Sequence, residues 1–233
     1  MMTRAATRAG GDTRTVQAAT RIFLVDDHPL VRQGLARLIE AEPDMTIVGE
    51  SEDTNAAMSR IDEVQPDVVV VDISLKDGSG IELVKQFKAQ HPKVKTLISS
   101  MHDELLYAER AMRAGAMGYV NKQEAAEKVV EAIRQVLRGK VYLSQRMTDT
   151  MVRRALGGQE EGAAESSVSA LSDRELEVFE MIGSGKTTRE IASRLHLSVK
   201  TVETHRQHIK TKLNLDNSNE LVHYAVKWVM ERD

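Results

Sequence analysis

Three acids, a hydroxyl and a lysine stand at or just after the ends of apolar stretches in the first half of the chain. The clearest case is Asp72, which follows four consecutive valines; the others are Asp26, Asp27, Ser100 and Lys122. Carboxylates that meet at one point repel each other, and the pKa of one rises unless a cation lies between them. Oxygen ligands suit a hard ion such as Mg²⁺. A carboxylate beside such an ion can attack a phosphoryl group, which lysine and hydroxyl donors can then hold.

The apolar stretches predict strands of a parallel sheet, because β-branched residues without alternation indicate a strand covered on both faces. Helical periodicity follows each stretch, and this alternation predicts a doubly wound α/β fold. We expect strands at 21–25, 45–50, 67–72, 95–100 and 118–121, and helices at 29–39, 55–64, 81–89, 104–114 and 125–137. The carboxyl ends of the strands share one edge of such a sheet, where ligands bind. The polar side chains should therefore converge there.

Each of these side chains also has an ordinary structural explanation. Asp26 or Asp27 could cap the helix that begins at Pro29. Ser100 could be a turn residue and Lys122 a solvated charge. For any one residue alone the ordinary explanation is favoured. The joint placement of all of them, at the ends of different strands, favours a shared site.

Composition limits the classes of protein that this chain can represent. Its 233 residues favour two domains. The absence of cysteine excludes disulfides, thiolate metal sites and a cysteine nucleophile, and fits a cytoplasmic location. No apolar run approaches the roughly 20 residues that cross a bilayer. Residues 1–20 carry three arginines but no apolar stripe, so we expect a disordered tail rather than a transit peptide.

The second half of the chain is predicted to be a small helical domain. After a helix at 144–156, the small and polar residues 157–167 predict a flexible linker. Helix starts beyond it show a capping residue followed three residues later by glutamate; these pairs are Ser172 with Glu175, Thr187 with Glu190, and Asn217 with Glu220. A brief turn separates the helix at 188–195 from the one that Ser198 opens, which is typical of a helix-turn-helix.

Charge supports a nucleic-acid partner for this second domain. The whole chain has a net charge of −3, but residues 186–212 hold seven basic residues against two acidic ones, a local net charge of +5. Such a concentration suits contacts with DNA phosphates, although a solvated helical face remains the alternative. His196, His205 and His208 also raise a metal site. We disfavour it because no carboxylate or cysteine has ligand spacing with them.

At its strand-end residues the chain resembles the receiver domain of two-component response regulators, whose fold is a flavodoxin-like five-stranded sheet. Asp26 and Asp27 match the acidic pair, Asp72 the phosphoacceptor, Ser100 the hydroxyl switch residue, and Tyr119 and Lys122 in GYVNK the switch aromatic and the lysine. The resemblance implies a Mg²⁺ ion held by Asp27, Asp72 and the backbone carbonyl of Ser74, with Asp26 in the same acidic set. It also implies that Tyr119 turns inward after phosphorylation. The chain departs from the family pattern at Lys76, where proline is common, and at Asn121.

The second domain resembles the LuxR-type helix-turn-helix, in the runs LSDRELEVF, GKTTREIA, LSVKTVETH and IKTKL. Together the two halves resemble a NarL/FixJ-type response regulator. The resemblance implies that residues 199–213 form the recognition helix. It places DNA contacts at Thr187, Thr188, Lys200, Thr201, Glu203, Thr204, Arg206, Gln207 and Lys210. Part of the last helix would form a two-fold contact, although core packing is a fair alternative; the residues concerned are Leu221, Val222, Ala225 and Val229.

The sequence therefore predicts a disordered tail (1–20), a receiver domain (21–140), a linker (141–168) and an all-α four-helix helix-turn-helix domain (169–233). We expect a transcription regulator that is not an enzyme, that is phosphorylated by a histidine kinase or a small acyl phosphate, and that binds operator DNA as a homodimer, away from membranes. Phosphorylation would act by releasing the second domain or by promoting dimerisation. One alternative is a phosphatase of the haloacid dehalogenase type, which needs an acid where Ser74 stands. The other is a DNA-binding protein that ignores phosphorylation.

Overall fold

The computed structural model describes residues 18–124, 127–156 and 167–230. Its first half holds a parallel sheet of five strands in the order β2-β1-β3-β6-β7. The strands are β1 (Thr20–Val25), β2 (Met45–Ser51), β3 (Val68–Val71), β6 (Lys95–Ser100) and β7 (Gly118–Asn121). Their order reverses between β1 and β3, and in open α/β sheets the crevice at such a reversal is the usual binding site.

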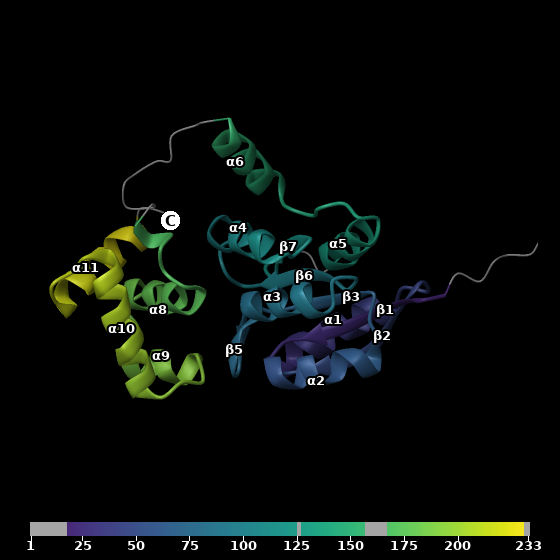
Figure 1. Cartoon of the computed structure of the whole chain (residues 1–233), viewed down its shortest axis with the longest axis horizontal. Coiled ribbons are helices and arrows are strands. Elements are labelled where there is room, and N and C mark those ends of the chain that lie inside the picture. The colour runs from purple at the N-terminus through teal and green to yellow at the C-terminus, as the bar shows by residue number, and fades with distance from the viewer. Residues whose placement is uncertain (1–17, 125–126, 157–166, 231–233) are drawn as a thin grey trace, which may run out of the picture.

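Helices cover both faces of this sheet (Figure 1). Apolar side chains of α1 and α5 form one buried layer with alternate strand residues, and those of α2, α3 and α4 form the other. These helices are α1 (Pro29–Glu40), α2 (Thr54–Val64), α3 (Gly80–Gln90), α4 (Glu104–Ala114) and α5 (Glu127–Leu137). All four valines of β3 are buried, because both of their faces are covered. The predicted doubly wound fold is confirmed.

The second half is helical, as predicted. It holds α8 (Asp173–Gly183), α9 (Thr188–Arg194), α10 (Val199–Leu213) and α11 (Ser218–Met230). The predicted capping boxes at Ser172 and Thr187 are both formed. Each hydroxyl accepts a hydrogen bond from the backbone amide of the glutamate three residues later, and the side chain of that glutamate accepts one from the amide of the capping residue. Between the halves, α6 (Gln145–Ala155) packs Met147 into the receiver core. The predicted tail and flexible linker lie largely outside the described residues.

One feature of the first domain was not predicted from the sequence. Shortly after Asp72 the chain forms a small antiparallel hairpin, β4 (Ser74–Leu75) and β5 (Gly78–Ser79). Two backbone segments lie close together at Gly80, where a Cβ atom would lie 1.8 Å from the carbonyl oxygen of Asp72. Only glycine fits that position.

Candidate functional site

The carboxylates of Asp26, Asp27 and Asp72 meet at the carboxyl edge of the sheet. Lys122 joins them there, with its Nζ 2.7 Å from Oδ2 of Asp26 and 2.7 Å from Oδ2 of Asp72. All four side chains are at most 7% exposed. The strands place them: Asp26 and Asp27 follow β1, Asp72 follows β3, and Lys122 follows β7. The structure thus brings together residues that 96 positions separate in the sequence, at the crevice where the strand order reverses.

This pocket holds more negative than positive charge. Burial raises the pKa of the Asp72 carboxyl, the charge of Lys122 counteracts this and that of Asp26 adds to it, and the net direction is upward. Although burial lowers the pKa of Lys122, the Asp72 and Asp26 carboxylates hold it above its ordinary value. Lys122 is therefore charged at neutral pH. One lysine does not neutralise three carboxylates, so a further cation would stabilise the ionised pocket.

The acidic cluster has the chemistry of a divalent metal site. Ligand atoms of Asp26, Asp27, His28 and Asp72 all lie within 4.8 Å of one another. Carboxylate oxygens dominate the set, which suits a hard ion that keeps several waters. Sequence reasoning missed His28, whose Nδ1 lies 2.7 Å from Oδ1 of Asp27. The only local signal for it was its position directly after the acid pair.

Ser100 and Tyr119 connect this pocket to the start of α4. Ser100 is fully buried at the end of β6, and its Oγ accepts a hydrogen bond from the amide of His102 at 3.3 Å. Tyr119 donates from its hydroxyl to the carbonyl oxygen of the same His102 at 2.8 Å. The Tyr119 side chain lies in an inward position in this structure, with 1% exposed.

The β4–β5 hairpin is anchored to α2. Asp77 at its tip accepts hydrogen bonds from the amides of Thr54 and Asn55 and from their side chains, at 2.7 to 3.2 Å. Burial opposes the shift, but these hydrogen bonds hold the pKa of Asp77 below its ordinary value. Lys76 makes an exposed ion pair with Glu52, at 3.1 Å. The loop after Asp72 is therefore held by Asp77 rather than by Lys76.

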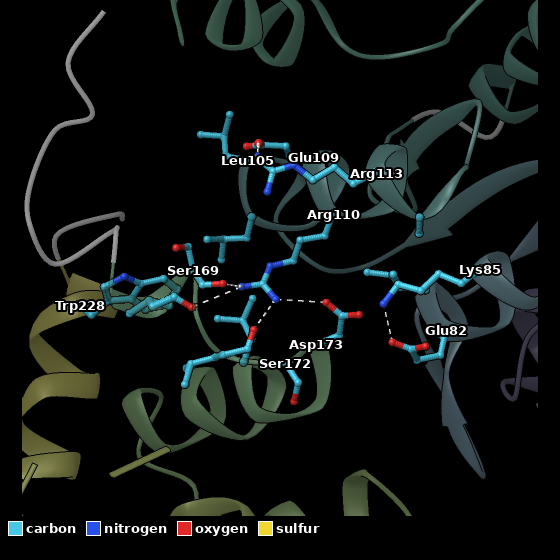
Figure 2. A pocket seen from close by; sticks show the side chains of 16 residues that line it. Glu82, Lys85, Leu105, Glu109, Arg110, Arg113, Ser169, Ser172, Asp173 and Trp228 are labelled. Carbon is cyan, nitrogen blue, oxygen red and sulfur yellow. Dashed lines mark hydrogen bonds and ion pairs between the residues drawn. The ribbon is translucent and has the colours of Figure 1, made fainter. Parts of the chain in front are cut away.

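One arginine of α4 makes several of the contacts between the second domain and the receiver. Arg110 donates to the backbone carbonyls of Leu171, Val168 and Ser169 at 2.7 to 3.3 Å. It also pairs with the Asp173 carboxylate at 3.2 Å. Figure 2 shows the guanidinium pointing across the boundary, beside a cavity of about 450 Å³ lined by α3, α4 and the start of α8. A single guanidinium thus ties α4 to the chain that enters the second domain.

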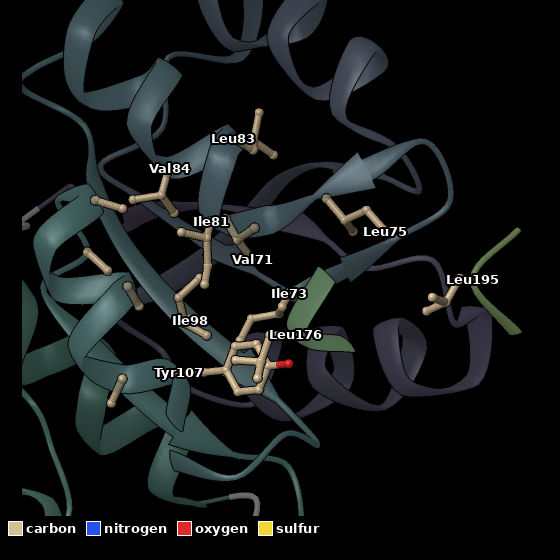
Figure 3. Close-up of a cluster of buried hydrophobic side chains, with 14 of the residues drawn as sticks. Val71, Ile73, Leu75, Ile81, Leu83, Val84, Ile98, Tyr107, Leu176 and Leu195 are labelled. Carbon is tan, nitrogen blue, oxygen red and sulfur yellow. The ribbon is translucent and has the colours of Figure 1, made fainter. Parts of the chain in front are cut away.

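A second contact leads from the hairpin to α8. The His102 ring lies between Ser74, whose Oγ is 2.8 Å from Nε2, and Glu180 of α8, whose carboxylate is 3.5 Å from Nδ1. Tyr107 donates its hydroxyl to the same Glu180 at 2.8 Å. Figure 3 shows Leu176 of α8 beside the Tyr107 ring and Ile73, and these three side chains are buried. The apolar core therefore continues from the receiver into the second domain.

The helix-turn-helix also reaches the acidic pocket itself. His196, in the turn between α9 and α10, has a left-handed backbone with φ of 53°. Its Nε2 lies 3.6 Å from Oδ2 of Asp27. The docked second domain thus lies within ion-pair distance of the acid pair.

Most side chains proposed to contact DNA remain accessible in this docked arrangement. Lys200, Glu203, Thr204 and Gln207 are exposed on α10, and Arg206 and Lys210 are partly so. Thr188 donates to the Glu203 carboxylate at 3.0 Å. Thr187 and Ser198 cap α9 and α10, so these helix starts are well defined. Docking therefore fixes where the helix-turn-helix lies without covering the face of α10.

The proposed two-fold contact on α11 needs correction at two positions. Leu221 and Ala225 are fully buried, and Ala225 packs so closely on α8 that a Cβ at Gly183 would lie 2.5 Å from its carbonyl oxygen. These two side chains belong to the core of the domain. Val222 is 41% exposed and Val229 is partly buried. Only these two remain candidates for a contact with a second copy.

Comparisons with known proteins agree with this architecture. Residues 22–134 match the response regulator receiver domain, and residues 169–225 match the bacterial regulatory proteins of the luxR family. The oxygen regulatory protein NreC of Staphylococcus carnosus is 37% identical over 210 residues, covering 89% of this chain and 97% of NreC. No helix among the described residues is long and apolar enough to cross a membrane.

Two solved structures are similar as well. One is a LuxR-family two-component response regulator from Aurantimonas, 35% identical, which covers 60% of this chain and 99% of its own with a TM-score of 0.56. The other is the RcsB response regulator of Salmonella typhimurium, 25% identical, covering 89% of this chain and 98% of its own with a TM-score of 0.56. The chain therefore belongs to the response regulators that join a receiver domain to a LuxR-type helix-turn-helix, a family of phosphorylation-regulated, DNA-binding transcription regulators.

Proposed function

We propose that Asp72 is the phosphoacceptor and that its phosphorylation undocks the helix-turn-helix domain from the receiver. The observation that carries this proposal is the position of the Asp72 carboxylate, buried between an acid pair and Lys122 at the sheet edge. A carboxylate oxygen of Asp72 would form a bond to phosphorus while the bond from phosphorus to the donor breaks, and the donor keeps that electron pair. The donor would be a phosphohistidine of a cognate kinase or a small acyl phosphate.

The residues around Asp72 fit a Mg²⁺ site. Asp27, Asp72 and the backbone carbonyl of Ser74 would hold the ion, with Asp26 beside them; the grouping of three carboxylates supports this. Mg²⁺ would neutralise charge on the phosphoryl oxygens. Lys122 lies where it could pair with one phosphoryl oxygen, and the Ser100 hydroxyl could donate to another.

The route from this site to the second domain runs through the docking contacts. A phosphoryl group adds nearly two negative charges at a pocket whose Asp27 lies beside His196 of the second domain. Movement of Ser100 toward the new charge would disturb the amide of His102, whose ring lies between Ser74 and Glu180. The contact between His102 and Glu180 would then weaken. We therefore favour release as the first step of activation, with dimerisation following it.

Released domains would pair on operator DNA as a homodimer, with the exposed face of α10 in the major groove. Lys200, Thr201, Arg206 and Lys210 would contact phosphates, and Glu203, Thr204 and Gln207 would approach base edges. Thr187 and Thr188 would flank them. We place the protein in the cytoplasm, without a membrane partner and without catalytic turnover of its own, since its two domains match families of DNA-binding regulators.

The test compares DNA affinity of the native chain and the Asp72→Asn variant, each with and without acetyl phosphate and Mg²⁺. We expect the donor to raise the affinity of the native chain only. The substitution is nearly isosteric, so both proteins should fold alike, as circular dichroism would check. Equal affinities under all conditions would instead support a DNA-binding protein that ignores phosphorylation.

A further inference from the structure

A second cluster of potential metal ligands lies inside the helix-turn-helix domain, remote in the sequence from the acidic pocket. His205 and His208 stand one helical turn apart on α10, so their side chains share a face. Glu175, on the first turn of α8, faces them from the neighbouring helix. One ligand atom from each residue lies within 4.8 Å of the other two, and Nδ1 of His208 is 3.7 Å from Oε1 of Glu175.

The three residues supply ligand types that a divalent metal binds. Glu175 offers a carboxylate, and His205 and His208 offer two imidazoles.

Two further observations indicate that coordination capacity remains here. Nδ1 of His205 is buried, and it finds no hydrogen-bond partner among the residues that the structure describes. In Glu175, Oε2 accepts from the Lys212 ammonium at 2.6 Å and from the Ser172 amide at 2.7 Å. Oε1 lies 3.7 Å from Nδ1 of His208. The hydrogen bonds to Oε2 thus orient the carboxylate and direct Oε1 toward the histidines.

We propose that Glu175, His205 and His208 bind one zinc ion between α8 and α10. Two imidazoles and one carboxylate are a ligand set that zinc accepts, with a fourth position open to water. Ligand atoms around tetrahedral zinc lie roughly 3.3 to 3.5 Å apart, given bonds of about 2.0 to 2.2 Å. The His208 side chain is 60% exposed and can make the small adjustment from its 3.7 Å separation. Zinc is favoured over other metals because softer ions prefer thiolate ligands, which this cluster lacks, and hard ions prefer sites made only of oxygen ligands.

Two basic side chains next to the cluster are paired with carboxylates. Lys212 is paired with Glu175, and Arg174 is paired with Glu177 at 2.6 Å. Sequence spacing hides this site, because its carboxylate comes from a helix about 30 positions before the histidines. The proposal concerns the folded domain itself and does not depend on phosphorylation of Asp72.

A bound zinc ion would attach α10 to the first turn of α8. Lys212 near the end of α10 already contacts Glu175, and Val202 and Ile209 pack the buried face of α10. A metal link beside them would stiffen the helix that carries the side chains proposed to contact DNA. We expect zinc to raise the unfolding temperature of the protein, since a ligand that binds only the folded state stabilises it.

The test uses the full-length chain, stripped of metals and kept in excess Mg²⁺ so that the acidic pocket is occupied. Zinc chloride is titrated by calorimetry into the native protein and into His208→Ala, with His223→Ala as the matched control, because His223 is an exposed histidine of the same domain on α11. We expect one zinc ion per chain, binding at least about tenfold more weakly in His208→Ala. The control should bind like the native protein.

Two further measurements make the result decisive. Ring resonances of His205 and His208 should shift on zinc addition in NMR spectra, and that of His223 should not. A His28→Ala variant separates the two clusters, because His28 belongs to the acidic pocket. Unchanged zinc affinity in His208→Ala, or loss of binding only in His28→Ala, would overturn the proposal. Circular dichroism without zinc verifies that each variant is folded.

Discussion

Replacement of Arg110 by alanine should open the docked arrangement of the two domains. The guanidinium donates to three carbonyls and one carboxylate of the segment that leads into α8. Truncation of one partner in a buried, charged hydrogen-bonding set costs about 2 to 5 kcal/mol. Because the Arg110 side chain is 20% exposed, water can replace part of the lost hydrogen bonding. We therefore expect the docked arrangement to lose about 2 to 3 kcal/mol of stability. At about 1.4 kcal/mol per tenfold, the ratio of docked to open molecules falls about 30- to 150-fold.

The absence of cysteine makes this measurable by energy transfer between two introduced labels. Glu63→Cys places one dye on the exposed side of α2 and Asn219→Cys places the other on α11. The Arg110→Ala background should show a larger low-transfer population than the native background, without phosphodonor. Arg113→Ala is the matched control, since its side chain is 79% exposed, lies one turn away and pairs with Glu109 of the same helix. Identical distance distributions in all three backgrounds, with and without acetyl phosphate, would refute the reasoning.

Two further predictions concern the loop after Asp72. Asp77→Ala removes the hydrogen bonds that hold the hairpin on α2 and should cost about 1 to 2 kcal/mol in urea unfolding; an unchanged midpoint would contradict the anchoring role. Folding lowers the pKa of Asp77. The stabilisation that Asp77 provides is therefore present above its unfolded pKa and is lost as the pH falls through its folded pKa. The native protein and the variant should thus converge in stability below about pH 4. Gly80→Ala puts a Cβ atom 1.8 Å from the Asp72 carbonyl oxygen, so the backbone at Asp72 must shift. We expect slower phosphorylation by acetyl phosphate and a loss of more than about 1 kcal/mol in stability. A native rate of phosphorylation would show that the close approach is not needed.

Local sequence patterns were sufficient to predict the longer strands and the helices of the receiver. β6, α4 and β7 have the predicted bounds, and α10 spans the predicted recognition helix. These elements could be predicted because β-branched runs, helical periodicity and capping spacing are properties of neighbouring residues. The β4–β5 hairpin could not be predicted, since strands of two residues carry no periodicity. Its order depends on Asp77 reaching α2, a contact across more than 20 positions.

The meeting of Asp26, Asp72 and Lys122 could also be predicted, because the order of strand ends in a parallel sheet follows from the fold class. The contacts between the two domains could not be predicted. Arg110 was only one charge on an amphipathic helix, and its partners lie about 60 positions later. Leu221 and Ala225 were assigned to a surface contact because a helical stripe does not reveal how many of its members the rest of the domain covers.

The central claim is that charge added at Asp72 moves the helix-turn-helix domain. The most direct measurement combines intact-mass spectrometry with energy transfer between the two labels, in acetyl phosphate with and without Mg²⁺. We predict that the native chain gains one phosphoryl group only when Mg²⁺ is present and that the low-transfer population rises with it, while Asp72→Asn shows neither change. A phosphoryl group that still appears on Asp72→Asn, or one on Asp72 that leaves the distance between the domains unchanged, would contradict the account.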